Sequence, residues 1–402
     1  MKILVFSHCG VVARYRRRFE LLAGYPGVRQ VTVVIPPRWW EGGGMVEGVA
    51  ECSANYRVRV ERAAFSSGSR QHAHYYPEAR KIVRDESPDL VFLDEEPHSF
   101  VTFHMATAVP PEVPLVFSTY QNLGKGIRED GLLRTTAYRV FRRRAFRRCC
   151  AAQAVGEDAA SLLRQSGFRG AVFILPIIGY DDAPGGNETG APVFPFARHR
   201  GALVAGFVGR LIHEKGPDLL LQACSRLPTI QVMIAGSGPL RGELERFAGS
   251  LGLLGRVAFV GPVAPCHIGG FFRSIDALVL PSRPHPQWVE QYGRVLVEAM
   301  AEGAVPVGSD SGEIPHVIGD AGLTFPAGDA HLLALALGRL EASGSLLAAC
   351  SGRARERAAR LYSNSRIAQG YYLAFRRVLG VSGTESVLAW PDPVWLPDPA
   401  AG

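Results

Sequence analysis

Short apolar runs alternate with helical patterns along almost the whole chain, and this alternation is the main guide to its fold. Strands that alternate with helices favour βαβ units and parallel sheets. We therefore predict an α/β protein built from doubly wound parallel sheets. The runs typical of buried strands lie at residues 2–6, 31–35, 90–93, 115–118, 151–154 and 172–175 in the first half, and at residues 203–208, 231–235, 257–260, 277–280 and 305–307 in the second.

A break in the pattern divides the chain into two halves. The stretch from Asp181 to His199 is rich in Gly and Pro, as linkers are, and 402 residues are long enough for two domains. We predict domains at residues 1–182 and 201–362, with a linker at 183–200 between them. A helix follows at 363–379, and the proline-rich tail at 380–402 is expected to be a loosely held extension.

The composition allows a large core, with 47% hydrophobic and 20% charged residues. The formal charge is +7, but nearly all of the 44 basic residues are arginine. Such a bias can reflect genomic base composition, so the charge does not by itself indicate a partner, and we expect no nucleic acid to bind.

Three further features predict a cytoplasmic protein. The 7 cysteines are scattered with no metal-ligand spacing, which fits reduced thiols. The first strand begins directly after Met1, which leaves no room for a signal peptide. No uninterrupted apolar stretch reaches the roughly 18 residues of a membrane span.

Glu290 and Glu298 follow the buried strand at 277–280 and precede the one at 305–307. The second half of their span has a helical pattern. On a helix the two carboxylates would lie roughly on one face, about 12 Å apart along the axis. The pair would then open a helix just past the carboxyl end of a strand, where open parallel sheets bind ligands and helix N–H groups meet anions. A solvated helix face is the alternative for an isolated pair.

The neighbouring sequence is similar to the retaining glycosyltransferases of family 4. The resemblance covers residues 201–378 well and the N-terminal part more loosely. It rests on five ordered blocks: GFVGRLIHEKG at 206–216, AGSGPL at 235–240, VAFVG at 257–261, WVEQYGRVLVEAMA at 288–301 and SDSGEIPHVIGDAG at 309–322.

This resemblance implies the GT-B fold, in which two Rossmann-like domains face each other across a cleft. It also implies that the helix at 363–379 crosses back to the first domain, and that the second domain binds a nucleotide-sugar donor. The residues that it places at the donor are Gly209, Arg210, Lys215, Gly236, Gly238, Glu290, Tyr292, Gly293, Arg294 and Glu298.

Each of the charged residues has an expected role. Breaking the sugar–phosphate bond leaves negative charge on a diphosphate, which Arg210 and Lys215 would meet as it develops. The resemblance places Glu298 at the ribose and Glu290 near the donor sugar, so Glu290, Arg210 and Lys215 are the expected catalytic residues. Backbone N–H groups at Tyr292, Gly293 and Arg294 would reach the donor from the helix N-terminus.

The first domain offers less specific signals. His8 and Gly10 lie in a turn after the first strand, which either contacts the donor or simply ends the strand. Family members often carry a histidine after the strand at 115–118. This chain has Tyr120, Gln121 and Asn122 there, any of which could supply neutral hydrogen bonds instead. The acidic turn from Asp94 to His98 either meets an acceptor hydroxyl or is solvated.

The segment from Arg134 to Arg148 predicts a basic helix with interspersed aromatic residues. Two interpretations remain open. The helix either touches an anionic membrane at its surface or is simply solvated.

We therefore predict a glycosyltransferase that moves a sugar from a nucleotide-diphosphate sugar to a hydroxyl acceptor (a glycan, a lipid-linked sugar or a small molecule), with retention inferred from the resemblance. No zinc, haem or iron–sulfur spacing is present, and no cofactor or catalytic metal is expected. The alternatives are a sugar-nucleotide epimerase on a similar scaffold and an inactive nucleotide-sugar-binding protein.

Overall fold

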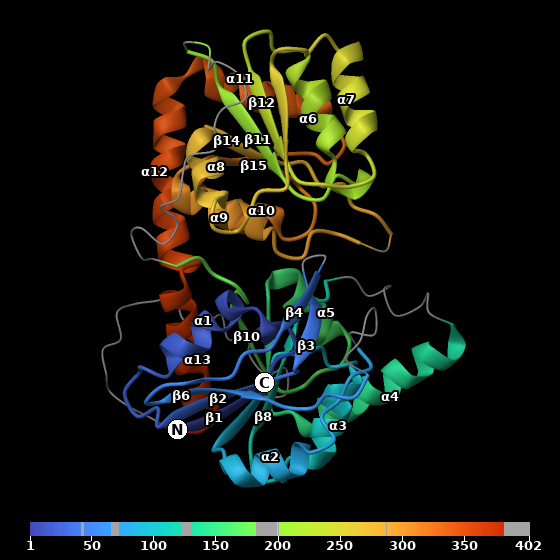
Figure 1. Ribbon diagram of the computed structural model, residues 1–402, viewed down its shortest axis with the longest axis vertical. Helices are drawn as coiled ribbons and strands as arrows, with labels where there is room; N and C mark the ends of the chain where they lie inside the picture. Colours follow the sequence, from blue (N-terminus) through green and yellow to red (C-terminus); the bar gives the residue numbers. More distant parts are fainter. Residues whose placement is uncertain are drawn as a thin grey trace. The chain divides into compact units, whose positions relative to one another are not determined.

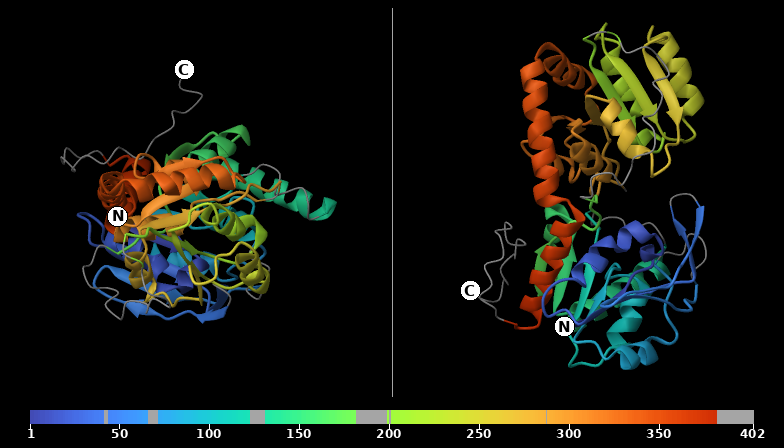
Figure 2. Two further views of the ribbon diagram at one scale, coloured as in Figure 1. Left: turned by 90° about the horizontal axis from the view of Figure 1, so that it is seen from above. Right: turned by 60° about the vertical axis from the view of Figure 1, so that its left-hand side comes forward.

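The computed structural model describes residues 1–41, 44–65, 72–122, 131–181, 199, 201–286 and 288–381. The chain divides into two compact units (Figure 1), and Figure 2 shows each from two further directions. The N-terminal unit comprises Met1–Ile178 and the chain from Asn364 onward, and the C-terminal unit comprises Gly179–Ser363. The predicted linker and proline-rich tail lie almost entirely outside the described residues.

The sheet of the N-terminal unit has the strand order β10-β9-β8-β7-β1-β2-β6-β5. Its neighbouring strands are parallel except for the antiparallel pair β5 and β6. The strands are β1 (Lys2–Phe6), β2 (Gln30–Ile35), β5 (Glu51–Cys52), β6 (Tyr56–Val60), β7 (Leu90–Leu93), β8 (Leu115–Thr119), β9 (Ala151–Ala154) and β10 (Ala171–Ile174), and β3 (Arg38–Glu41) and β4 (Gly44–Glu47) form a separate hairpin.

The last helix that the structure describes belongs to this unit. It is α13 (Asn364–Val378), which packs against α1 (Ala13–Leu22). Its buried Tyr371 ring lies 5.7 Å from the ring centroid of Phe19 and 5.3 Å from that of Phe92, so residues far apart in sequence share one core. The other helices of the unit are η1 (Cys9–Val11), α2 (Ala79–Glu86), α3 (Phe100–Ala108), α4 (Leu132–Arg148) and α5 (Glu157–Gln165).

The sheet of the C-terminal unit is parallel throughout, with the order β13-β12-β11-β14-β15-β16. Its strands are β11 (Val204–Val208), β12 (Gln231–Ala235), β13 (Val257–Gly261), β14 (Ala277–Leu280), β15 (Val305–Ser309) and β16 (Leu323–Phe325). Its helices are η2 (His213–Lys215), α6 (Pro217–Cys224), α7 (Arg241–Ser250), α8 (Ile268–Ser274), α9 (Arg294–Glu302), α10 (Ile314–Ile318), α11 (Ala330–Ala342) and α12 (Gly344–Leu361).

Every strand predicted from a continuous apolar run is present, with its ends shifted by at most a few residues. The strands that the pattern missed are β3 to β6 and β16. In β6 the buried Tyr56 and Val58 alternate with the exposed Arg57, and the short β16 lies at the edge of its sheet. Strands with one solvent-exposed face alternate apolar and polar residues instead of forming continuous apolar runs. The three-residue β16 is too short to stand out as a run.

Within the described part of the chain, no single helix is long and apolar enough to cross a membrane. By length and composition, α11 and α12 would be long and apolar enough only if taken together. The chain bends by 102° between these two helices.

Candidate functional site

The predicted donor residues all follow three neighbouring strands of the C-terminal sheet, β12, β11 and β14. The chain builds β12 and β13 on one side of β11, then returns to build β14 to β16 on the other. The winding therefore reverses between β11 and β14, and open parallel sheets bind ligands at such switch points, outside the carboxyl ends of the strands. The loops after these two strands carry Lys215 and Glu290 respectively.

Lys215 and Glu290 form an ion pair between the two loops. The Lys215 Nζ atom lies 2.6 Å from Glu290 Oε2, and the buried Ser282 donates a hydrogen bond to the same oxygen at 3.0 Å. The Lys215 ammonium also lies 4.8 Å from the ring centroid of Trp288, within cation–π range. Trp288 was part of a recognised block but had no assigned role, and Ser282 had no signal of its own.

Close backbone approaches hold these loops together. Gly216 has a φ of +64°, and a Cβ there would lie 2.2 Å from the Pro281 carbonyl oxygen. The Lys215 loop therefore rests directly on the end of β14. On the other side, the Glu313 N–H donates to the Glu290 carbonyl at 3.1 Å. The Glu290 backbone is thus held by the loop that follows β15.

The sequence-based placement of Glu290 on a helix face is wrong. Glu290 lies in the loop after β14, because α9 begins only at Arg294, after Gly293 has adopted the left-handed conformation with φ 70°. Glu298 does lie on α9, where its carboxylate is 3.2 Å from Arg294 Nε, one helical turn away. The helix is present as predicted, but the two carboxylates do not share it.

The glycines predicted at the donor also come together. A Cβ on Gly236 would lie 1.8 Å from the Gly209 carbonyl oxygen, and one on Gly238 would lie 2.4 Å from that of Leu211. The turns after β11 and β12 are therefore in backbone contact. Arg210, between Gly209 and Leu211, is exposed, and Tyr292 is buried with its ring 6.2 Å from that of Tyr362.

In the N-terminal unit, Asp94 directly follows the carboxyl end of β7 and is the centre of a buried polar network. Its carboxylate accepts hydrogen bonds from Arg18 at 2.6 Å, Ser7 at 2.7 Å and the Tyr120 hydroxyl at 2.8 Å. Asp94 is only 1% exposed. The interpretation of this acidic turn as solvated is therefore wrong, and Tyr120 directs its hydroxyl to Asp94.

The pKa values of the next two carboxylates in the same turn shift in opposite directions. Burial raises the pKa of Glu96 to about 7, although Thr119 and the Tyr120 N–H donate to it at 2.8 and 2.7 Å. The pKa of Glu95 is lowered, because His8 and His74 outweigh the effect of its burial. The pKa of His8 is raised, because Glu95 outweighs the effect of burial on the imidazole.

The remaining predicted residues of this unit pack at the ends of their strands. The Gly10 N–H donates to Ser7 Oγ at 3.1 Å, and the Gln121 N–H donates to Thr119 Oγ1 at 3.3 Å. Gln121 and Asn122 are half-buried beyond β8. His74 had no sequence signal, because it is separated from both His8 and Glu95 along the chain.

Residues 195–357 match the family model of the glycosyl transferases group 1. This part of the chain, called the group 1 domain below, is similar to that family. Among curated proteins, the chain is similar to the D-inositol 3-phosphate glycosyltransferases of Mycobacterium tuberculosis and Mycobacterium bovis, with 30% identity over 195 residues. The match covers 45% of this chain and 38% of the length of those relatives.

Solved structures resemble the chain over both units. HepE from Anabaena, in complex with UDP, aligns with a TM-score of 0.68 at 20% identity and covers 94% of this chain and 100% of its own. Sucrose-phosphate synthase from Thermosynechococcus elongatus aligns with a TM-score of 0.65 at 18% identity, covering 94% and 99%. The predicted GT-B fold, with two parallel-sheet domains, is confirmed.

The contact between the glycine turns of the group 1 domain can be tested with Gly236→Ala. Gly236 has a φ of +135°, and its Cβ would overlap the Gly209 carbonyl, so we expect a loss of more than about 2 kcal/mol in unfolding free energy. Gly242→Ala is the matched control, because a Cβ there meets nothing within 4 Å inside α7. That variant should be stabilised by about 0.5–1 kcal/mol. Denaturant unfolding measures both, and equal stabilities would contradict the close contact.

Proposed function

We propose that the protein transfers a sugar from a nucleotide-diphosphate sugar to a hydroxyl acceptor, with retention of anomeric configuration. The observation that carries the proposal is the pairing of Lys215 and Glu290 at the switch point of a group 1 domain. It places a cation and a carboxylate, held at 2.6 Å from each other, where such sheets bind ligands.

The positive groups would serve the leaving diphosphate. In the transfer, the bond from the anomeric carbon to the phosphate oxygen breaks and its electron pair stays on the diphosphate. Lys215, Arg210 and the N-terminus of α9 would stabilise this charge. The half-buried setting of Lys215 strengthens its interaction with an anion relative to bulk water.

Glu290 and Glu298 would act on different parts of the donor. Glu290, held by Lys215 and Ser282, would position the sugar or stabilise positive character at the reacting carbon. Glu298, beside Arg294, would accept from the ribose hydroxyls. We propose a front-face route, in which the leaving phosphate oxygen takes the acceptor proton as the new carbon–oxygen bond forms.

The structural neighbours suggest which donor to test first. HepE from Anabaena has been solved with UDP and with UDP-glucose. We therefore propose a UDP-sugar as the donor, with UDP-glucose the first candidate. The epimerase and the inactive binding protein are not favoured, because the matched family and the named relatives are glycosyl transferases.

A membrane surface is the proposed environment of the acceptor. On α4, Leu133 is 89% and Val140 51% exposed, and Arg139, Arg143 and Arg147 are exposed at intervals of four residues. At 100° per residue these side chains share one face. Cationic side chains attract anionic lipid, and exposed apolar side chains beside them can insert at the head-group level. The proposed location is the cytoplasm, at the inner membrane face.

Lys215→Ala should weaken the binding of UDP. A hydrogen bond to a charged group is worth about 1.5–3 kcal/mol, so the Kd should rise roughly ten- to a hundredfold. Isothermal titration calorimetry with UDP measures this change. Lys81→Ala, on the exposed surface of α2, is the matched control and should bind as the native chain does. Equal affinity in both variants would remove Lys215 from the donor site.

Glu298→Gln and Glu290→Gln should separate binding from chemistry. The first should mainly raise KM for the donor, because the ribose does not change in the reaction. The second should mainly lower kcat, on the order of ten- to a hundredfold, because it acts at the reacting sugar. Steady-state transfer from UDP-glucose provides both constants. Glu302→Gln is the control on the same helix. A pure loss of donor affinity in both site variants would show that the roles are not divided.

Replacing Arg139, Arg143 and Arg147 by Gln should release the protein from anionic vesicles. Each arginine near such a surface contributes about 1 kcal/mol, so binding should fall more than about tenfold. Co-sedimentation with phosphatidylcholine vesicles that contain phosphatidylglycerol measures it. Replacing Arg80, Lys81 and Arg84 of α2 by Gln removes the same charge from another exposed helix and should have little effect. Equal losses would mean that net charge, rather than α4, drives the binding.

A further inference from the structure

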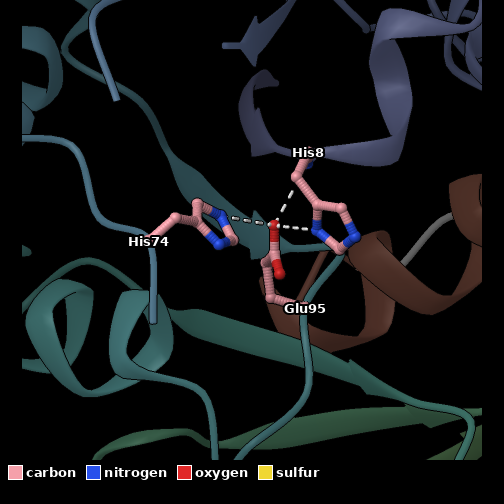
Figure 3. Close-up of side chains that lie close together, drawn as sticks. All are labelled: His8, His74 and Glu95. Carbon is pink, nitrogen blue, oxygen red and sulfur yellow. Dashed lines mark hydrogen bonds and ion pairs between the residues drawn. The ribbon is translucent and has the colours of Figure 1, made fainter. Parts of the chain in front are cut away.

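Figure 3 shows His8 and His74 directed at the carboxylate of Glu95 from either side. Glu95 Oε1 lies 2.7 Å from His8 Nδ1 and 3.3 Å from His74 Nε2. One ligand atom from each residue lies within 4.8 Å of the other two. All three residues are buried, with 5%, 0% and 2% of their surfaces exposed.

The three residues converge from separate parts of the N-terminal unit. His8 follows β1, Glu95 follows β7, and His74 lies in the segment that leads to α2. β1 and β7 are neighbours, and the winding of the sheet reverses between them. The cluster therefore occupies the switch point of its own sheet, the kind of position at which such sheets bind ligands. The group 1 family model begins at residue 195 and does not reach it.

The donor set fits a divalent transition ion. Zinc takes imidazole nitrogens at about 2.0–2.1 Å and carboxylate oxygens at about 2.0–2.2 Å. Neighbouring ligand atoms in a tetrahedral site are then roughly 3.4 Å apart, close to the 3.3 Å between His74 and Glu95. The His8 contact, at 2.7 Å, would need to open by about 0.7 Å to reach this spacing. Two imidazoles select against magnesium and calcium, which prefer oxygen ligands.

A tryptophan ring packs against both histidines of the cluster. The Trp39 ring lies 4.7 Å from that of His8 and 4.9 Å from that of His74, measured between centroids. Trp39 itself is 4% exposed and belongs to the β3–β4 hairpin. Apolar shells around metal sites limit solvent access, so an ion held here would exchange slowly.

We propose that His8, His74 and Glu95 bind one divalent transition ion that ties together the loop after β1, the segment before α2 and the turn after β7. These three protein ligands leave the fourth position of a tetrahedral ion to water. The ion takes no part in the proposed sugar transfer, whose expected donor residues lie mainly in the C-terminal unit. No catalytic metal is expected for that transfer. The proposal therefore does not depend on the proposed function.

Titration of the chelator-treated full chain with Zn²⁺ tests the proposal. We expect one ion per chain by calorimetry and by elemental analysis, and a rise in Tm when zinc is added, because an ion that binds only the folded chain stabilises it. Co²⁺ in place of zinc should give the visible absorption of a nitrogen- and oxygen-ligated site. The intense sulfur-to-cobalt band should be absent, which separates this site from the free thiols, including the nearby Cys9.

His74→Ala should weaken zinc binding by more than about tenfold, since the loss of even an outer-shell partner has effects of that size. Glu95→Gln keeps the side-chain volume and tests the charge if His74→Ala does not fold. His104→Ala is the matched control, because His104 lies on α3 and contacts the Tyr76 carbonyl instead. Absence of a one-to-one site, a thiolate spectrum, or equal zinc affinity in His74→Ala and His104→Ala would overturn the proposal.

Discussion

The parallel strands of the two sheets determine where the two clusters of charged side chains lie. Strands that run in one direction bring their carboxyl ends to the same edge, and the loops at that edge diverge where the winding reverses. Both units meet this condition, between β1 and β7 in one and between β11 and β14 in the other. The densest charge clusters described above occupy these two places. Their position follows from the topology of each sheet.

The charged side chains at the two switch points differ in their exposure to solvent. At Lys215 and Glu290 the side chains are partly accessible, with 16% and 11% of their side-chain surfaces exposed. Charges in such a setting can exchange partners with an incoming anion at modest cost. The carboxylates of Asp94 and Glu95 are buried. Because a buried charge without a partner carries a large desolvation penalty, each must keep its cationic or hydroxyl partners. The first arrangement suits a substrate that comes and goes, and the second suits a permanent structural role.

Glycines allow the loops of the C-terminal site to come into backbone contact. The turns after β11 and β12 touch through their backbones at Gly209 and Gly236, and the loop after β11 meets β14 at Gly216. Any Cβ at Gly216 or Gly236 would overlap a carbonyl oxygen, and both have positive φ. The ion pair between Lys215 and Glu290 depends on this closeness, because it joins residues on two loops that the backbone contacts hold in place.

The sequence by itself determined the strand pattern, the α/β class and the stretch of chain that forms the group 1 domain, because buried parallel strands are continuous apolar runs and the motif blocks are local. It missed β6 because its Tyr56 and Val58 alternate with polar residues. It misplaced Glu290 because both carboxylates were assigned to one helix, whereas α9 begins only after the left-handed Gly293. Only the tertiary structure decided that Asp94 and Glu95 are buried and that His74 meets His8. Burial and such contacts depend on crossovers that join segments distant in sequence, and no local pattern records them.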